Sequence, residues 1–212
     1  MRLLVMVFVS LLWAFPAWAK GEKPGSFDYY ILSLSWSADW CALTGDARQD
    51  PQCAAGRGLT FTLHGLWPEY AKGYPFDCPT TEPDPASSDY EAMADIMGGA
   101  GLARYEWQKH GRCTGLSAAA YYDAMRKAYG TITIPPIFAQ VPQTTRISVG
   151  SVHDAFLQSN PGLTAAGVAV TCKQDRIEDV RICLSKDLTP RDCGTDVVSS
   201  CIAKDAELDA AR

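Results

Sequence analysis

The sequence lacks the excess of positive charge with which many proteins attract polyanions. Its 212 residues contain 19 lysines and arginines against 24 aspartates and glutamates, which gives a net charge of −5, and they contain only three histidines. An acidic chain gains no long-range attraction to a polyanion, so its charge slightly disfavours a nucleic-acid partner. If it does handle nucleic acid, a few local cations must hold the ligand, with a shallow dependence on salt.

Cysteine pairs of the Cys-x-x-Cys type are also absent. None of the eight cysteines has that spacing, which argues against a zinc ribbon and against a thioredoxin-like redox pair. The even number instead fits four disulfides formed in an oxidising compartment. The single asparagine, Asn160, precedes Pro161, so the sequence has no N-glycosylation sequon, which weakly favours a bacterial periplasm over a eukaryotic secretory route.

Long apolar runs are missing except at the start of the chain. Residues 3–15 form an apolar stretch that follows Arg2 and precedes Ala17-Trp18-Ala19, a pattern typical of a signal peptide over residues 1–19. No later run reaches the roughly 18 to 20 apolar residues of a membrane helix. We therefore expect an exported protein, periplasmic or extracellular, without a membrane partner after cleavage, whose residues 20–212 form one domain.

Strand patterns occur at both ends of the expected domain. The aromatic and β-branched stretch 27–36 and the alternating stretch 59–67 predict two strands, the second ending at Gly65 because the proline three residues later cannot donate to a ladder. Residues 167–173 and 177–185 predict a late pair of strands.

Helical spacing occupies the middle of the sequence. Four helices are expected, at residues 90–97, 102–110, 117–128 (with Ser117 as N-cap) and 151–159, with loops between the cysteines at 41 and 53 and over the proline-rich stretch 71–90. Strands and helices interleave without a regular βαβ rhythm. We expect an α+β fold, a single domain with a central, mainly antiparallel sheet that is flanked by helices and stapled by disulfides.

The stretch YEWQKHGRC, residues 105–113, concentrates chemically active side chains. On a helix, Glu106, Lys109 and His110 occupy positions i, i+3 and i+4 and so share one face. A histidine can give or take a proton near neutral pH, a lysine can hold an anion, and a carboxylate can orient the imidazole or share in proton handling. The trio suits a charged phosphoryl centre. The alternative is an ordinary ion pair on a wet helix face.

The stretch 105–113 does not match the pattern of a zinc-binding helix. A zincin helix needs His-Glu-x-x-His, and Tyr105 and Lys109 occupy its two ligand positions, so we expect no metal.

His64 lies near the end of a predicted strand. Two histidines are what a metal-free phosphodiester cleavage requires, one to take a proton and one to give one, each contributing roughly 10²- to 10⁴-fold. The third, His153, is interpreted as a surface or packing residue.

Two segments resemble a known family. FTLHGLWPEY (61–70) and YEWQKHGRC (105–113) are similar to the active-site segments of the ribonuclease T2 family, whose usual forms read roughly HGLWP and HEWxKHGxC. They occur in the family's order and at a comparable separation. FDYYILSLSWSADWC (27–41) and AVTCKQDRIEDVRICLS (169–185) resemble its first strand and its late strand pair. The resemblance covers nearly the whole chain after residue 19.

The resemblance implies roles for the matching positions. His110 would be the general base that deprotonates a ribose 2′-hydroxyl, and His64 the general acid that protonates the departing 5′-oxygen. Glu106 and Lys109 would stabilise the phosphorane. Trp67 would line the phosphate and base side of the cleft, although packing against the Pro68 corner is an alternative. Family members need no metal, form a 2′,3′-cyclic phosphate, open it to a 3′-phosphate, and spare DNA.

One position departs from the family pattern. The residue before Glu106 is commonly a third active-site histidine that contacts phosphate, and here it is Tyr105, which can donate a hydrogen bond but carries no charge. We expect retained cleavage with weaker phosphate binding. Tyr74, after the first motif, would stack on a base, with a surface or packing role as the alternative.

The resemblance also implies a disulfide pairing, which spacing alone leaves open among 105 possibilities. The expected bridges are Cys41 with Cys53, Cys78 with Cys113, Cys172 with Cys201, and Cys183 with Cys193.

The sequence therefore indicates a monomeric, exported, metal-independent and cofactor-free endoribonuclease that acts on single-stranded RNA and not on DNA. A secreted binding protein that keeps the scaffold without catalysis is an alternative, but both histidines, the glutamate and the lysine are present. A metal-dependent hydrolase is a further alternative that lacks its ligand pattern.

Overall fold

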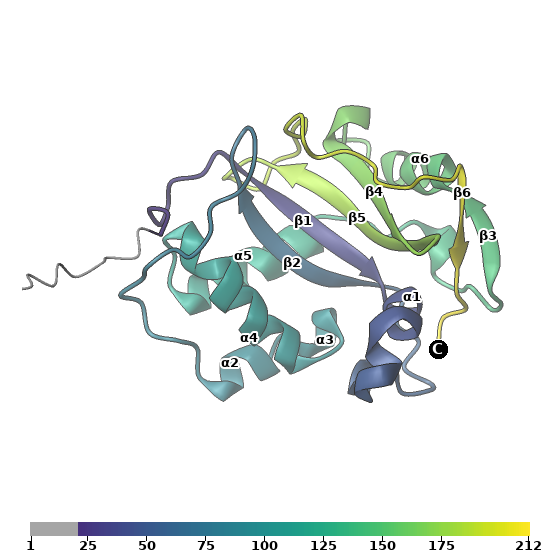
Figure 1. Cartoon of the computed structure of the whole chain (residues 1–212), viewed down its shortest axis with the longest axis horizontal. Helices are drawn as coiled ribbons and strands as arrows, with labels where there is room; N and C mark the ends of the chain where they lie inside the picture. The colour runs from purple at the N-terminus through teal and green to yellow at the C-terminus, as the bar shows by residue number, and fades with distance from the viewer. Residues whose placement is uncertain (1–20) are drawn as a thin grey trace, which may run out of the picture.

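A six-stranded sheet runs through residues 21–212, the part of the chain that the computed structural model describes (Figure 1). The strands are β1 (Tyr29–Trp36), β2 (Phe61–Glu69), β3 (Thr145–Ser148), β4 (Val168–Lys173), β5 (Arg176–Leu184) and β6 (Asp205–Leu208). Their order is β2-β1-β5-β6-β3, and β4 also pairs with β5. Every pairing is antiparallel except that of β5 with β6. The predicted α+β class with a mainly antiparallel sheet is confirmed, while the expected signal peptide lies outside the described residues.

Helices cover the sheet from two sides. They are α1 (Ser37–Trp40), α2 (Ser87–Glu91), α3 (Ala94–Met97), α4 (Ala100–Lys109), α5 (Ala118–Gly130) and α6 (Val149–Ser159). In Figure 1, α2 to α5 gather beside β1 and β2, whereas α6 lies beside β4. The Ser117 side chain accepts a hydrogen bond from the Ala120 N–H at 3.3 Å, so the predicted N-cap of α5 is confirmed. Within the described residues, no helix has the length and apolar character needed to cross a bilayer.

One large apolar core joins the sheet to the helices. Trp36 and Phe61 from β1 and β2 are buried against Phe138, with ring centroids 5.1 to 6.1 Å apart in edge-on or tilted contacts. Trp107 of α4 and Tyr121 of α5 are fully buried in the same core. Because Trp107 and Glu106 are neighbours on α4, packing of the indole fixes the rotation of the helix and thereby the direction of the predicted catalytic face.

Two sequence-based expectations about local structure were wrong. Strand β2 does not end at Gly65 but continues through Pro68 to Glu69. It is an edge strand, where a proline can stand without removing a ladder hydrogen bond. The expected loop between Cys41 and Cys53 is instead largely helical, with a π-helical turn at Cys41–Gly45 followed by short 3₁₀ turns.

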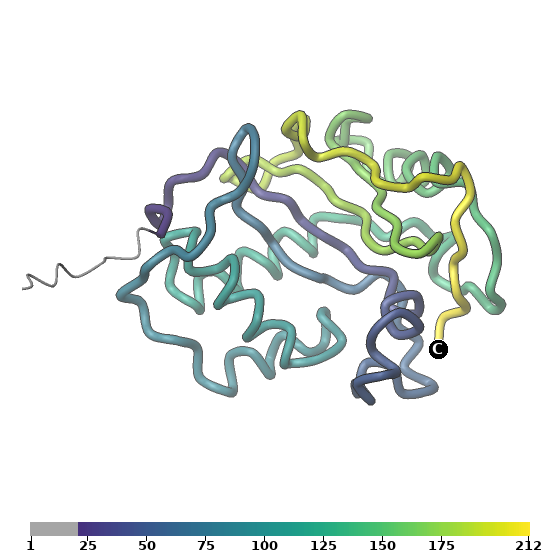
Figure 2. Tube along the Cα trace, in the orientation of Figure 1, coloured from purple at the N-terminus to yellow at the C-terminus, as the bar shows by residue number. Residues whose placement is uncertain are grey.

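Four disulfides cross-link the fold, over sequence separations of 10 to 35 positions. The bridges are Cys41–Cys53, Cys78–Cys113, Cys172–Cys201 and Cys183–Cys193, as the resemblance implied. The bridge from Cys78 ties the long loop after β2 to the turn that follows α4. At the other end, Arg212 pairs with Asp46 at 2.6 Å, so the end of the chain lies beside the helical turns after β1 (Figure 2).

Candidate active site

A β-bulge in β2 presents the first residue of the candidate site, His64. Ser33 of β1 pairs with Gly65 and Leu34 pairs with Leu63, so His64 is an extra residue without a partner in the ladder. A bulge turns the side chain of the extra residue away from the regular alternation. The His64 side chain therefore does not follow the alternation that buries its neighbours in the core, and it is 29% exposed.

The end of α4 supplies the second part of the site. Glu106 is buried on the helix, Lys109 is its last residue, and His110 is the C-cap with φ −120° and ψ −44°. The His110 N–H still donates to the Glu106 carbonyl oxygen at 2.9 Å, so the position of His110 remains set by the helix. The structure thus brings the three predicted side chains to one place, although the helix ends one residue earlier than expected.

All seven residues predicted for catalysis or substrate binding line one cleft of about 910 Å³. They are His64, Trp67, Tyr74, Tyr105, Glu106, Lys109 and His110. The third histidine, His153, lies on α6 outside this cleft, where its Nε2 is 3.1 Å from the Ala165 carbonyl oxygen. The cleft is large enough for more than a single phosphodiester group.

Trp67 contacts both histidines of the cleft. Its ring centroid is 5.1 Å from that of His64, edge-on at 80°, and 5.3 Å from that of His110, nearly parallel at 27°. Its indole N–H donates to Glu106 Oε2 at 2.7 Å. The indole therefore packs against both imidazoles and binds the buried carboxylate, and it also borders the cleft. The two roles considered for Trp67 are thus compatible in this geometry.

Gly65 makes this arrangement possible. A Cβ atom at this position would collide with Glu106 Oε2 and with the indole nitrogen of Trp67. Glycine is therefore required for the close approach of α4 to β2, and not for an unusual backbone angle.

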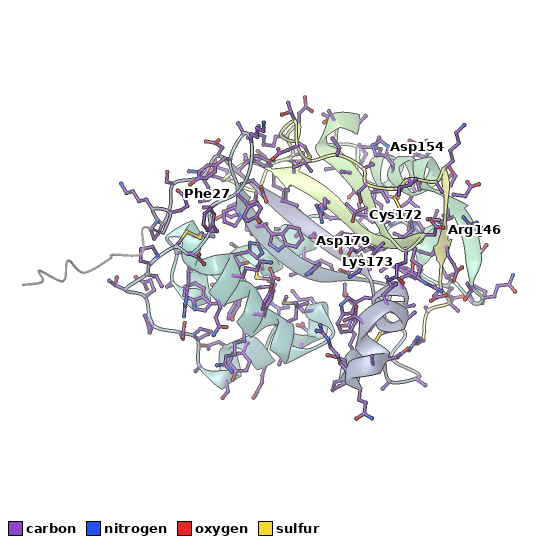
Figure 3. All side chains as sticks on the ribbon, viewed as in Figure 1. Phe27, Arg146, Asp154, Cys172, Lys173 and Asp179 are labelled. Carbon is purple, nitrogen blue, oxygen red and sulfur yellow. A yellow bond between two sulfur atoms is a disulfide. The ribbon has the colours of Figure 1, made fainter. Side chains whose placement is uncertain are left out.

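A buried carboxylate holds the other side of His64. Asp179 Oδ1 lies 3.2 Å from His64 Nδ1, and the Ser35 hydroxyl donates to the same oxygen at 2.6 Å. On its opposite side, His64 Nε2 is 3.9 Å from Glu106 Oε1. Ser35 and Asp179 face each other across β1 and β5, and Figure 3 shows Asp179 in the middle of the sheet.

These contacts favour the protonated form of His64. Burial lowers the pKa of His64, but the hydrogen bond and charge of Asp179 and the charge of Glu106 outweigh it, so the pKa is raised above its ordinary value. Burial alone would raise the pKa of Asp179, yet its contacts with His64 and Ser35 keep that pKa below its ordinary value. His64 with Asp179 is thus arranged as a proton donor with a permanent anionic partner.

The opposite holds for His110. Its burial, and then the positive charges of Lys109 and His64, lower the pKa of His110 to about 3. Its Nδ1 is buried without a hydrogen-bond partner among the described residues. Burial raises the pKa of Glu106 to about 7, against the lowering effects of His64, Trp67 and Lys109. At mildly acid pH one histidine is charged and the other neutral, which is the pairing that general acid–base chemistry needs.

The tyrosines and the lysine form the outer rim of the cleft. Lys109 Nζ lies 5.4 Å from the centroid of the Tyr105 ring, and its contact with Tyr105 raises the pKa of Lys109. Tyr105 and Tyr74 are 49% and 55% exposed, so both rings are open to a ligand. The lysine thus remains a cation whose position Tyr105 helps to set.

Three residues of the site were missed by the sequence analysis: Ser35, Asp179 and Arg181. Asp179 and Arg181 lie two positions apart on β5 and therefore face the same side of the sheet. A buried carboxylate inside a largely apolar strand was the only available signal. Strand alternation does not reveal which distant side chain such a carboxylate meets.

The potential ligands of a metal were also compared in space. Within residues 21–212, no cluster of three or more histidine, cysteine or carboxylate side chains has an arrangement that could hold a metal ion.

Comparisons with known proteins agree with this geometry. The family model for "Ribonuclease T2 family" matches residues 27–193. A ribonuclease of Aeromonas hydrophila is 48% identical over 99 residues, which make up 47% of this chain and 43% of that protein, so the match spans less than half of the relative. A ribonuclease T2 protein of Caenorhabditis elegans is 25% identical over 221 residues, covering 92% of this chain and 76% of that protein. The solved structure of an RNase-related protein from Calystegia sepium has the same fold, with a TM-score of 0.69 and 22% identity over 88% of this chain and 98% of its own.

Proposed function

The chain belongs to the ribonuclease T2 family, and from this membership we propose that it is a metal-independent endoribonuclease that cleaves single-stranded RNA. The observation that supports the proposal most directly is the pair of imidazoles that contact Trp67 in one cleft, with pKa values displaced in opposite directions. A protein that only binds RNA has no need of two histidines in complementary protonation states.

In the first step, neutral His110 takes the proton from a ribose 2′-hydroxyl, and the 2′-oxygen attacks the adjacent phosphorus. The bond from phosphorus to the 5′-oxygen breaks, and protonated His64 gives its proton to that leaving oxygen. The products are a 2′,3′-cyclic phosphate and a free 5′-hydroxyl. DNA is not a substrate because it lacks the nucleophile.

In the second step the two histidines exchange roles. His64, now neutral, takes a proton from water, the water oxygen attacks the cyclic phosphate, and His110 returns its proton to the departing 2′-oxygen. The product is a 3′-phosphate, and both histidines regain their starting protonation states.

The neighbouring side chains assist without changing covalently. Lys109 stabilises the negative charge that increases on the phosphoryl oxygens. Glu106, whose pKa of about 7 lets it exist in either form, can donate to or accept from the phosphorane. Asp179 is a positioning residue: its contact with Nδ1 turns Nε2 of His64 towards the cleft. Trp67, Tyr74 and Tyr105 border the substrate.

We also propose that residues 1–19 are a signal peptide, that residues 20–212 are the catalytic domain, and that the exported enzyme acts as a monomer in the periplasm or outside the cell. The composition, the four disulfides and the apolar start of the sequence support this location.

A homopolymer RNA assay in excess EDTA tests the activity. We expect cleavage of poly(U) or poly(A), 2′,3′-cyclic phosphate ends that become 3′-phosphates, and no cleavage of single-stranded DNA. Loss of cleavage in EDTA, with recovery on adding a divalent cation, would reject the mechanism. Binding of RNA without any cleavage would instead favour the non-catalytic alternative.

A further inference from the structure

Arg181 is a cation in the cleft that the proposed chemistry does not use. It lies on β5 directly opposite Ser33 of β1, which in turn faces Gly65 of β2. Its guanidinium carbon is 5.3 Å from the centroid of the Trp67 ring, two strands away. The side chain therefore reaches across the face of the sheet into the floor of the cleft, which it helps to line.

The guanidinium group has almost no partners of its own. The Arg181 Nε is buried and has no hydrogen-bond partner among the described residues. The carboxylate oxygen paired with the guanidinium, Asp179 Oδ2, is 3.7 Å from it, which is too far for a hydrogen bond. Four other arginines pair with carboxylates at 2.5 to 2.9 Å: Arg112, Arg126, Arg176 and Arg212. A buried donor without a partner is costly, so a guanidinium in a cleft whose Nε has no hydrogen-bond partner indicates a place for an external acceptor.

The surrounding acids do not neutralise this cation fully. Asp179 directs Oδ1 to His64 and Ser35. Burial raises the pKa of Glu69, which also faces Arg181, to about 8, so Glu69 is mostly protonated at neutral pH. Asp196, a further acid of the cleft, accepts a hydrogen bond from the Gly73 N–H at 2.6 Å. The guanidinium charge therefore remains available to an anion.

We propose that Arg181 binds a backbone phosphate of single-stranded RNA next to the phosphate that is cleaved. The inference rests on the proposed function, because that function supplies the polyanion. A planar guanidinium matches the oxygens of a phosphate, and its contact with Trp67 limits its freedom. His64 turns Nε2 towards Glu106 and Nδ1 towards Asp179. The scissile phosphate belongs on the Nε2 side. The Arg181 guanidinium lies 3.7 Å from Asp179 Oδ2, the carboxylate on the Nδ1 side, so we assign it to a neighbouring phosphate.

Substrates of two lengths distinguish binding of a neighbouring phosphate from a role at the scissile phosphate. A dinucleoside monophosphate has only the scissile phosphate, whereas a hexanucleotide also has its neighbours. For Arg181→Gln we expect KM for the hexanucleotide to rise roughly tenfold or more, the scale of one charge-assisted hydrogen bond, with kcat little changed. At mildly acid pH, where His64 is protonated with or without the charge of Arg181, cleavage of the dinucleoside monophosphate should stay within about twofold of wild type. Arg181→Lys should recover part of the loss.

A matched control and a salt series sharpen the result. Arg104 lies on the other side of α4, outside the cleft, so Arg104→Gln should leave both substrates unaffected. The slope of log KM against log salt for the hexanucleotide should become shallower by about 0.7 in Arg181→Gln, as expected for one lost phosphate contact on a single strand. Equal losses on both substrates, or a KM for the hexanucleotide equal to wild type, would overturn the inference.

Equilibrium binding distinguishes this inference from the proposed function. A fluorescent hexadeoxynucleotide, which lacks the 2′-hydroxyl, should bind to wild type and about tenfold more weakly to Arg181→Gln. Wild-type protein that binds the oligomer but cleaves no RNA would reject the proposed function alone. Equal affinities of the two proteins would reject the role of Arg181 alone, and a wild type that neither binds nor cleaves would reject both.

Discussion

Asp179 Oδ1 lies 3.2 Å from His64 Nδ1, although 115 positions separate the two residues in the sequence. The contact crosses β1, whose Ser35 donates to the same carboxylate oxygen. It gives the histidine on the edge strand a fixed orientation and an anionic partner in the interior of the sheet.

Asp179→Asn should move the alkaline limb of the pH profile. The carboxylate raises the pKa of His64, so its loss should lower that pKa, and the rate should begin to fall at a lower pH than in wild type. Glu106 and Arg181 also act on the pKa of His64 and are left in place. We expect a loss of roughly tenfold or more in kcat at neutral pH. Ser35→Ala, which keeps the charge, should have a smaller effect, and an alkaline limb that does not move would contradict the role of Asp179.

Removal of either cleft histidine should nearly abolish cleavage. His64→Ala and His110→Ala should each lower kcat by roughly 10²- to 10⁴-fold, the usual contribution of a general acid or base. The double variant should lose little more than either single variant, because the two groups act in one concerted step. His153→Ala, outside the cleft, is the matched control and should keep wild-type rates. Circular dichroism checks the folding of all four proteins, and an active His110→Ala protein would exclude the proposed base.

The pH dependence of kcat/KM should be bell-shaped and displaced towards acid. His110, whose pKa is lowered to about 3, must be neutral to accept a proton, so activity should persist well below pH 6. His64 must be protonated, and since its pKa is raised, the alkaline limb should lie above the ordinary histidine pKa of about 6.5. Initial rates on a short oligonucleotide at constant ionic strength give the profile. A flat profile between about pH 4 and 9 would be incompatible with this pair.

Gly65→Ala should damage the site without removing a reactive group. The added methyl group would collide with Glu106 Oε2 and the indole nitrogen of Trp67, forcing α4 and β2 apart. We expect a stability loss of about 1–3 kcal/mol and a disproportionate loss of kcat, because the two imidazoles lose their common contact with Trp67. Gly130→Ala, where nothing lies within 4 Å of the new atom, is the control. Urea unfolding and single-turnover rates measure the two effects, and unchanged kinetics would show that the close approach is dispensable.

Glu69→Gln should change how stability depends on pH. The pKa of Glu69 is about 8 in the folded protein against an ordinary value of 4.5, so the folded state binds more protons between these values. The contribution of Glu69 to the free energy of unfolding is therefore present at low pH and lost as the pH rises from about 5 to 8. Over that range wild type should lose on the order of 2 kcal/mol relative to Glu69→Gln.

The comparison of the two proteins isolates Glu69. Asp39 and Glu106, whose pKa values are both raised to about 7, act in the same direction as Glu69, whereas His110 acts in the opposite one. These groups are common to both proteins and cancel in the difference. Urea unfolding at about pH 5 and pH 8 supplies the measurement, with Glu82→Gln in the exposed loop as control. If the free energy of unfolding changed equally with pH in wild type and Glu69→Gln, that result would contradict the raised pKa of Glu69.

Much of the fold could be predicted from local pattern. Strand β1 and helix α5 follow from an aromatic, β-branched run and from the Ser117 cap, since these signals lie within a few residues of the structure they specify. Strands β3 and β6 were missed because they are four residues long and one of them is largely exposed, so neither has a clear alternation. The extension of β2 through Pro68 depends on its edge position, which is a property of the whole sheet.

By itself the sequence determined which reactive groups are available: His64 in one motif and Glu106, Lys109 and His110 in the other, with a glycine, a tryptophan and paired cysteines around them. Only the tertiary structure decided that Asp179 meets His64, that Trp67 contacts both histidines, and that the buried Nε of Arg181 has no hydrogen-bond partner among the described residues. The physical reason is that the charge state of an imidazole depends on burial and on neighbouring charges, and these neighbours come from strands distant in the sequence.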